Sequence, residues 1–136
     1  MDEFGYREIE HTADWELEVW APNLSTLLEQ AARGMYTLAG TTLQPGPRQM
    51  KQLSLNSLDA ESLLVDFLDE LLWLVEDEGL AFEQFKISIQ NNSSLDAVLV
   101  GALIAQRTKE IKAVTYHNLR IIKSLRGLEV RIVFDV

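Results

Sequence analysis

Hydrophobic and acidic residues alternate along the segment 15–20, which is the two-residue period of a half-buried β-strand. The apolar positions Trp15, Leu17 and Val19 are expected to face the core, whereas Glu16 and Glu18 are expected to face water. The segment 128–134 shows the same alternation and gives the clearest strand prediction in the chain.

Two other segments carry apolar residues every three or four positions, which is the spacing of one helix face. The first covers about 24–38, with Asn23 or Ser25 as its N-cap and Gly40 as its C-terminal stop. The second runs from a cap at Ser57 or Asp59 to about position 77, and its broad apolar face predicts a central buried helix. It is rich in acidic residues, and no basic residue within it offsets them.

Most of the remaining chain has strand patterns, with turns at 91–94 and 126–127. Six further segments predict strands, the first of them as an edge strand or an arm: 4–9, 50–56, 82–90, 95–105, 113–116 and 121–125. The order strand, helix, strand, helix and then a run of strands favours an α+β fold. We expect two helices on one face of a mostly antiparallel or mixed β-sheet, in a single domain spanning 1–136.

Composition narrows the function classes. The net charge of −9 argues against direct, stable binding of nucleic acid, and the absence of cysteine excludes disulfides and thiolate metal sites. The sequence shows neither a signal-peptide layout nor an apolar run of membrane-spanning length. We therefore expect a cytoplasmic protein with no membrane partner.

Basic residues are concentrated in the segment 107–131, where they outnumber the two acids Glu110 and Glu129. The basic residues of this segment are Arg107, Lys109, Lys112, Arg120, Lys123, Arg126 and Arg131. They form either a solvated sheet face, which the pattern favours, or one half of a two-signed surface for a charged partner.

Candidate chemistry begins at His11 and Asp14, which lie three positions apart just before the first alternating strand. Asp135 follows the last apolar position of the final strand, and Val136 would add a terminal carboxylate if the native chain ends there. If these two strands are antiparallel neighbours, Asp14, Asp135 and the Val136 carboxylate converge, and such a set of oxygen ligands suits Mg²⁺ or Ca²⁺. The simpler interpretation, which the pattern alone favours, is that Asp14 caps a turn and Asp135 is solvated.

A second polar segment spans 112–117. Strand alternation would place Lys112 on one face and His117 on the other. A lysine near carboxylates could orient them or contact phosphate, although a lysine on an exposed strand is the commoner case. For His11, a hydrogen bond to the backbone of a turn is favoured over a role as metal ligand or general base. The chain contains no Gly-rich phosphate loop, nucleophile elbow, paired-histidine motif or EF-hand loop.

Three segments resemble the signatures of the archease family: Glu-His-Thr-Ala-Asp at 10–14, Lys-Ala-Val-Thr-Tyr-His at 112–117 and Val-Arg-Ile-Val-Phe-Asp-Val at 130–136. The resemblance covers the whole chain. It implies a protein cofactor of the RtcB-type tRNA-splicing ligase that promotes guanylylation and multiple turnover of that RNA ligase. It also implies a divalent cation, calcium in crystals with Mg²⁺ or Mn²⁺ as alternatives, at the positions of Asp14, Asp135 and Val136. Lys112 matches a functionally required lysine.

Three function classes therefore remain. The first is the non-enzymatic ligase activator, and the second is a chaperone or modulator of a tRNA-modifying enzyme such as a methyltransferase, a role also proposed for the family. The third is a small hydrolase that uses Asp14 and His11, which would require a concave pocket beside them. The sequence offers no nucleophile, so the hydrolase ranks last.

Overall fold

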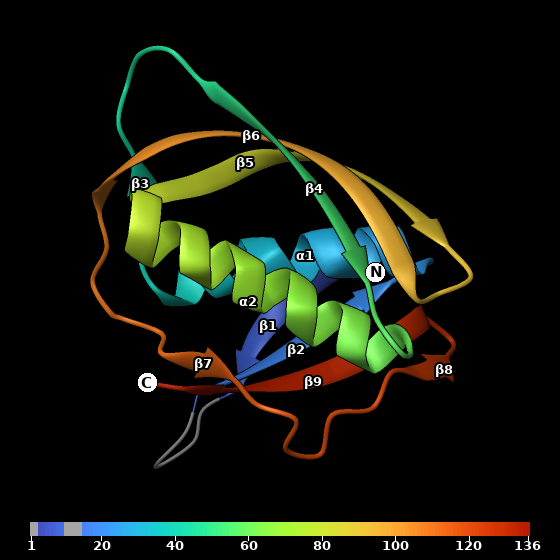
Figure 1. Ribbon diagram of the computed structural model, residues 1–136. Helices are drawn as coiled ribbons and strands as arrows, with labels where there is room; N and C mark the ends of the chain where they lie inside the picture. The colour runs from blue at the N-terminus through green and yellow to red at the C-terminus, as the bar shows by residue number, and fades with distance from the viewer. Residues whose placement is uncertain (1–2, 10–14) are drawn as a thin grey trace.

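The structure, a computed structural model, describes residues 3–9 and 15–136 (Figure 1). The described elements follow one another in this order: β1 (Gly5–Ile9), β2 (Trp15–Ala21), α1 (Leu24–Leu38), β3 (Thr42–Leu43), β4 (Gln49–Asn56), α2 (Ala60–Glu78), β5 (Leu80–Gln90), β6 (Ser94–Gln106), β7 (Ala113–Val114), β8 (Ile122–Ser124) and β9 (Gly127–Asp135). The predicted order of two helices among many strands is confirmed.

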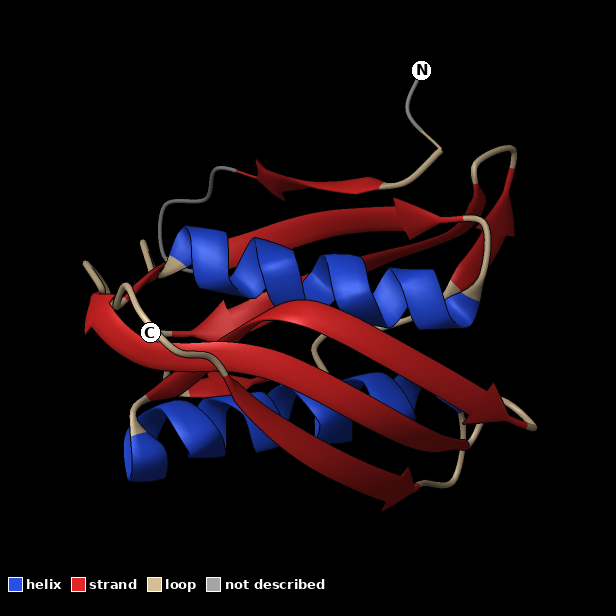
Figure 2. Ribbon diagram, turned by 90° about the horizontal axis from the view of Figure 1, so that it is seen from above, coloured by secondary structure: helices blue, strands red, loops and turns tan. Residues whose placement is uncertain are grey.

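The strands form two sheets, in which every described pairing is antiparallel. One sheet has the order β1-β2-β9-β7, with β8 also paired to β9. The other has the order β3-β6-β4, with β5 also paired to β6. Both helices lie between the sheets, because α1 packs against β1, β2 and β5 while α2 packs against β5, β6 and β7 (Figures 1 and 2). The α+β class is confirmed, and the division into two sheets is a feature that the sequence pattern does not show.

The helix boundaries follow from their caps. The Asn23 side chain accepts a hydrogen bond from the Thr26 backbone N–H at 2.9 Å, so Asn23 is the N-cap of α1. Asp59 does the same for the Ser62 N–H at 2.8 Å at the start of α2. Gly79 ends α2 in the left-handed conformation, with φ 64°.

Basic residues outside α2 form ion pairs with the acidic residues of its C-terminal turn. Glu76 pairs with Arg107 at 2.8 Å, and Glu78 pairs with Lys51 of β4 at 2.9 Å. These cations offset the unfavourable interaction between acidic residues and the C-terminal end of a helix dipole.

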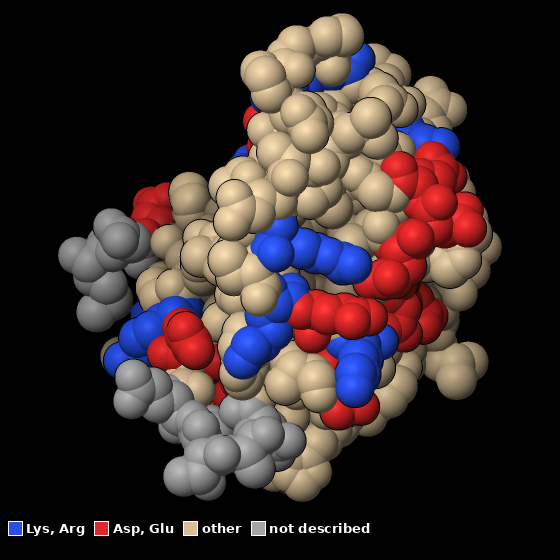
Figure 3. Space-filling model, turned by 90° about the vertical axis from the view of Figure 1, so that its left-hand side faces the viewer, with Lys and Arg blue, Asp and Glu red and all other residues tan. Residues whose placement is uncertain are grey.

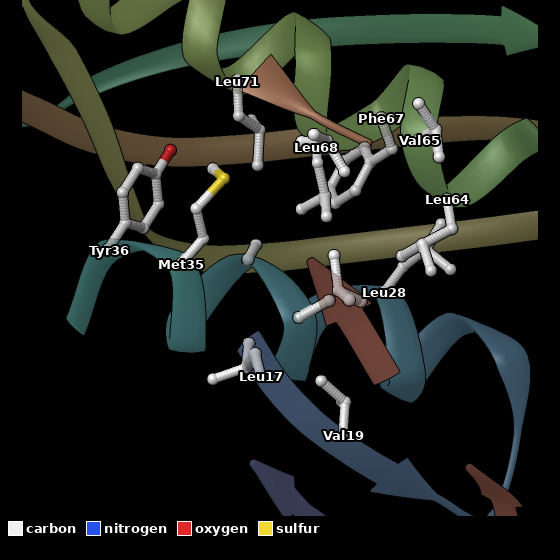
Figure 4. Packing of buried hydrophobic residues seen from close by; sticks show 14 of the residues in the cluster. Leu17, Val19, Leu28, Met35, Tyr36, Leu64, Val65, Phe67, Leu68 and Leu71 are labelled. Carbon is white, nitrogen blue, oxygen red and sulfur yellow. The ribbon is translucent and has the colours of Figure 1, made fainter. Parts of the chain in front are cut away.

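The core lies between the sheets and contains both helices (Figure 4). Leu17 and Val19 of β2 are fully buried, as are Ile132 and Phe134 of β9. Trp15 is partly buried and packs against this cluster. The alternation along the two strands therefore identified their core-facing positions correctly.

The outer face of β2 differs from the prediction. Glu18 is only 8% exposed, and the side chain of Glu16 is only 12% exposed, so neither faces open water. The alternation correctly places Glu18 on the outer face of β2. On that face the Arg7 and Arg126 side chains cover Glu18 through ion pairs at 2.8 and 2.5 Å. A carboxylate can be buried in a folded protein when ion pairs of this kind compensate its charge.

Two late strands are shorter than the sequence predicts. β7 contains only Ala113–Val114 instead of 113–116, and β8 contains Ile122–Ser124 instead of 121–125. The chain leaves the strand at Thr115, whose hydroxyl donates to the backbone carbonyl of Val133 at 3.0 Å. Tyr116 is then 57% exposed.

Candidate functional site

Strand β9 brings two of the three sequence motifs together at the end of its sheet where β9 terminates at Asp135. We call this end of the sheet the carboxylate edge. Trp15, the first residue of β2, lies opposite Phe134, the residue before Asp135. On the other side of β9, Val114 also lies opposite Phe134, and Ala113 lies opposite Asp135. The condition set for convergence of the candidate ligands is met, because β2 and β9 are antiparallel neighbours.

Backbone hydrogen bonds fix the second motif against the C-terminal strand. The Lys112 N–H donates to the Asp135 carbonyl at 2.8 Å, and the Thr115 N–H donates to the Val133 carbonyl at 3.0 Å. The side chains of Lys112 and Asp135 are both exposed. No ion pair connects either of them to another residue in the described parts of the chain.

The other predicted site residues have different outcomes. His11 and Asp14 lie outside the described residues, so their roles stay predictions. Val136 is partly buried and packs against the core. His117 is exposed, and its Nε2 atom lies 3.3 Å from the side-chain nitrogen of Asn118. Because β7 ends at Val114, the predicted alternation does not extend to His117.

No group of three or more histidine or acidic side chains suited to a metal occurs within 3–9 and 15–136. The predicted ligand set includes Asp14, which is not among those residues. The metal centre therefore remains a prediction, in which Asp135 and Val136 supply the described part.

A cation–π contact missed by the sequence analysis lies beside this edge. The Nζ atom of Lys109 is 3.9 Å from the ring centroid of Trp15. The segment that carries Lys109 is held in place because the N–H groups of Thr108 and Lys109 both donate to the Ala39 carbonyl, at 2.8 and 3.1 Å. The only signal in the sequence was the basic character of the segment 107–131.

Helix α2 is also linked to the second motif. Partial burial raises the pKa of the Asp69 carboxyl, and the nearby Asp66 charge raises it further, whereas the hydrogen bond from the Val114 N–H lowers it. A cavity of about 400 Å³ lies here, lined among others by Asp69, Trp73, Glu110 and Lys112. Acidic and basic side chains lie next to one another on this end of the molecule (Figure 3).

The model of the Archease protein family matches residues 6–136. The chain belongs to the archease family. The family resemblance that the three motifs indicate is thereby confirmed.

The relatives cover nearly the whole chain. Protein archease of Methanosarcina acetivorans is 32% identical over 139 aligned residues, which cover 96% of this chain and 95% of that protein. Protein archease of Archaeoglobus fulgidus is 31% identical, with coverages of 96% and 98%. A crystal structure from Thermotoga maritima, described as an archease and possible chaperone, is 26% identical, with a TM-score of 0.70 and 96% coverage of both chains. Membership of the family therefore applies to the fold as well as to the sequence.

A membrane-spanning helix is absent from the described ranges, since neither α1 nor α2 combines the necessary length and apolar character.

Proposed function

We propose that the chain is a non-catalytic protein cofactor that acts in the cytoplasm on an RtcB-type tRNA-splicing RNA ligase. It promotes guanylylation of the ligase and its multiple turnover. Membership of the archease family supports this proposal. The observation that carries it is the meeting of the motifs at β9, where the Lys112 N–H binds the Asp135 carbonyl and Trp15 lies opposite Phe134.

The described part of this edge suits a divalent cation. The Asp135 carboxylate is exposed at the end of β9 and has no ion-pair partner among the described residues. Carboxylate oxygens are the ligands that Ca²⁺, Mg²⁺ and Mn²⁺ accept most readily. In the proposal Asp14, Asp135 and Val136 hold the cation, with calcium the first choice. When bound, it would supply positive charge that reduces repulsion between phosphate groups at the ligase site.

The chain's own residues present this edge to the ligase. The backbone hydrogen bond from the Lys112 N–H to the Asp135 carbonyl holds the residue before β7 against the end of β9, and the side chains of both residues are exposed. An ammonium group there can contact a phosphate or orient a carboxylate. His11 and His117 are further candidates for contact with the ligase.

A multiple-turnover RNA ligation assay tests the proposal. We expect Asp135→Asn to abolish the stimulation of the ligase and Lys112→Gln to reduce it. The matched controls are Asp96→Asn and Lys86→Gln, because both residues are exposed on the other sheet and lose the same charges. Undiminished stimulation by Asp135→Asn would reject the role of the carboxylate edge.

A chaperone or modulator of a tRNA-modifying enzyme, such as a methyltransferase, is the second candidate. The description of the Thermotoga maritima relative as a possible chaperone favours it, and large apolar side chains such as Trp73, at 53% exposure, are available for contact. Aggregation of a client methyltransferase is the discriminating measurement. If Asp135→Asn protects the client as well as the wild type but still fails to stimulate the ligase, the two roles use different surfaces.

A further inference from the structure

A cavity of about 460 Å³ lies on the outer side of the β1-β2-β9 sheet, on the face opposite to the helices. Its walls come from the connection between β7 and β8, from β8 and the turn after it, and from β9 and β2. The residues that line it include three arginines and two glutamates: Arg120, Arg126, Arg131, Glu18 and Glu129. One net positive charge therefore lines a cavity in a chain whose net charge is −9.

One arginine is part of the cavity's rigid framework. Arg126 pairs with Glu18 at 2.5 Å and with Glu129, and its guanidinium carbon lies 4.3 Å from the ring centroid of Trp20. The pKa of both glutamates is lowered. Hydrogen bonds from Arg126 and then Arg7 are the main causes for Glu18, and hydrogen bonds from Ser124 and then Arg126 are the main causes for Glu129. Both acids therefore stay ionised and their charge is used to hold Arg126 in place.

The other two arginines keep hydrogen-bonding capacity for a ligand. Arg131 lies 3.6 Å from Glu16 and 3.8 Å from Glu18, beyond hydrogen-bond length, and its side chain is 61% exposed. Arg120 is exposed and has no ion pair with another residue in the described ranges. Each guanidinium presents several N–H donors in a planar fork that matches phosphate oxygens.

We propose that this cavity binds a small phosphate ester, of which a nucleoside monophosphate is the type, through Arg120 and Arg131. Phosphate is favoured over a carboxylate because the two guanidinium groups come from different walls. A tetrahedral phosphoryl group accepts hydrogen bonds from several directions, whereas a carboxylate accepts them in one plane. Ile122 of β8, which is 50% exposed, offers an apolar surface for the sugar or base.

The size of the cavity agrees with this ligand class. Sites for small molecules usually enclose roughly 300–1,000 Å³, and this one has about 460 Å³. The site is separate from the edge that carries Asp135. Arg131 and Asp135 are four residues apart on β9, which corresponds to roughly 13 Å along a strand, and strand alternation places both on the outer face. Occupation of the cavity thus does not depend on the proposed ligase function.

Isothermal titration calorimetry of the full chain in EDTA tests the proposal, with adenosine 5′-monophosphate, ribose 5-phosphate and inorganic phosphate as separate probes. EDTA removes cation-mediated binding at carboxylates. We expect the wild type to bind the esters, and Arg120→Gln to weaken binding at least about tenfold, as expected for a lost charge-assisted hydrogen bond. Lys123→Gln is the matched control, because Lys123 is exposed on β8 and does not line the cavity.

Three results would overturn the proposal. The first is no heat of binding for the wild type at millimolar ester, and the second is equal weakening by Arg120→Gln and Lys123→Gln, which indicates non-specific charge. The third is binding of a short RNA without binding of any ester, which would reassign the surface to nucleic acid. Asp135→Asn should bind the ester as the wild type does, so failure of the ligase proposal is measured separately. Circular dichroism melting of each variant confirms its folding.

Discussion

Replacement of Glu18 by glutamine tests the network that supports the outer face of β2. Glu18 is 8% exposed, and its carboxylate accepts hydrogen bonds from Arg7 at 2.8 Å and from Arg126 at 2.5 Å. Glutamine has nearly the same volume but no charge, so the substitution leaves the packing unchanged and removes the charge-assisted part of both bonds. Its amide group also presents donors where the carboxylate had acceptors.

The expected loss follows from these two contacts. A hydrogen bond to a charged group contributes about 1.5–3 kcal/mol when it is shielded from solvent. The side chain of Arg7 is 66% exposed, so its bond is screened and contributes much less. We therefore expect Glu18→Gln to lower the free energy of unfolding by about 2 kcal/mol at neutral pH. The control is Glu83→Gln, which removes a pair with Arg48 at 2.6 Å in which both side chains are at least one-third exposed, and should cost at most about 1 kcal/mol.

The effect should depend on pH with a defined sign. Hydrogen bonds from Arg126 and Arg7 lower the pKa of Glu18 in the folded chain. A carboxyl group with a lowered folded pKa stabilises the fold fully above its unfolded pKa, about 4.3 for glutamate, and loses that contribution as the pH falls through the folded value. The difference between wild type and Glu18→Gln should therefore be constant near neutral pH and shrink below about pH 4.

Urea unfolding followed by tryptophan fluorescence, at pH 7 and at successively lower pH, measures both quantities. A chain of 136 residues is in the size range where two-state unfolding is usual, so the midpoints can be converted to free energies. If Glu18→Gln loses no more stability than Glu83→Gln at pH 7, the buried ion pairs of Glu18 do not stabilise the fold more than an exposed pair does. If the loss is unchanged in acid, the contribution does not come from the ionised carboxylate.

Two further predictions concern local backbone geometry, and a third concerns calcium binding. Asn23→Ala removes the N-cap of α1 and should destabilise the chain by about 1 kcal/mol in urea unfolding. Gly40→Ala should destabilise it more than Gly79→Ala: both glycines have φ 64°, but a Cβ at Gly40 would lie 2.2 Å from the Thr108 hydroxyl, whereas Gly79 has open space. Calcium at 100 times its Kd should stabilise the wild type by about 2.7 kcal/mol in thermal melts, and Asp135→Asn should lose this effect.

The sequence predicted those parts of the fold that depend on local periodicity. The inward positions of β2 and β9 were identified because a strand buries every second residue. For each helix the sequence left two candidate N-cap residues. The side-chain hydrogen bonds of Asn23 and Asp59 show that these two residues are the N-caps. These features are encoded within a few residues of where they act.

The features that were missed depend on residues far apart in the sequence. Glu18 is covered by Arg7, which is 11 residues away, and by Arg126, which is 108 residues away. The alternation of apolar and polar residues predicts which face of the sheet a side chain occupies, but it does not predict which other side chains cover it. The division into two sheets also depends on residues far apart, because among the described strands β6 pairs with β3, β4 and β5. No local pattern records which strands share a sheet.

The candidate edge was partly predictable because antiparallel pairing relates the beginning of one strand to the end of another. Trp15 lies opposite Phe134, as this argument requires. The position of Lys112 beside Asp135 does not follow from spacing, since a backbone hydrogen bond across two separate motifs creates it. The sequence contained one indication of the arginine-lined cavity, which was the excess of basic residues in 107–131.

Strand β9 carries both proposed sites and a large part of the core at once. Its inward residues Ile132 and Phe134 are fully buried, whereas Arg131 and Asp135 point outward. A change to an inward residue would disturb the packing beneath both sites, so its effects on ligase stimulation and ester binding could not be separated. Polar substitutions at exposed positions, on the outer face of β9 or in the connection between β7 and β8, leave that packing intact. Asp135→Asn and Arg120→Gln should therefore each remove one activity and spare the other, and loss of both activities in either variant would mean that the two surfaces form one site.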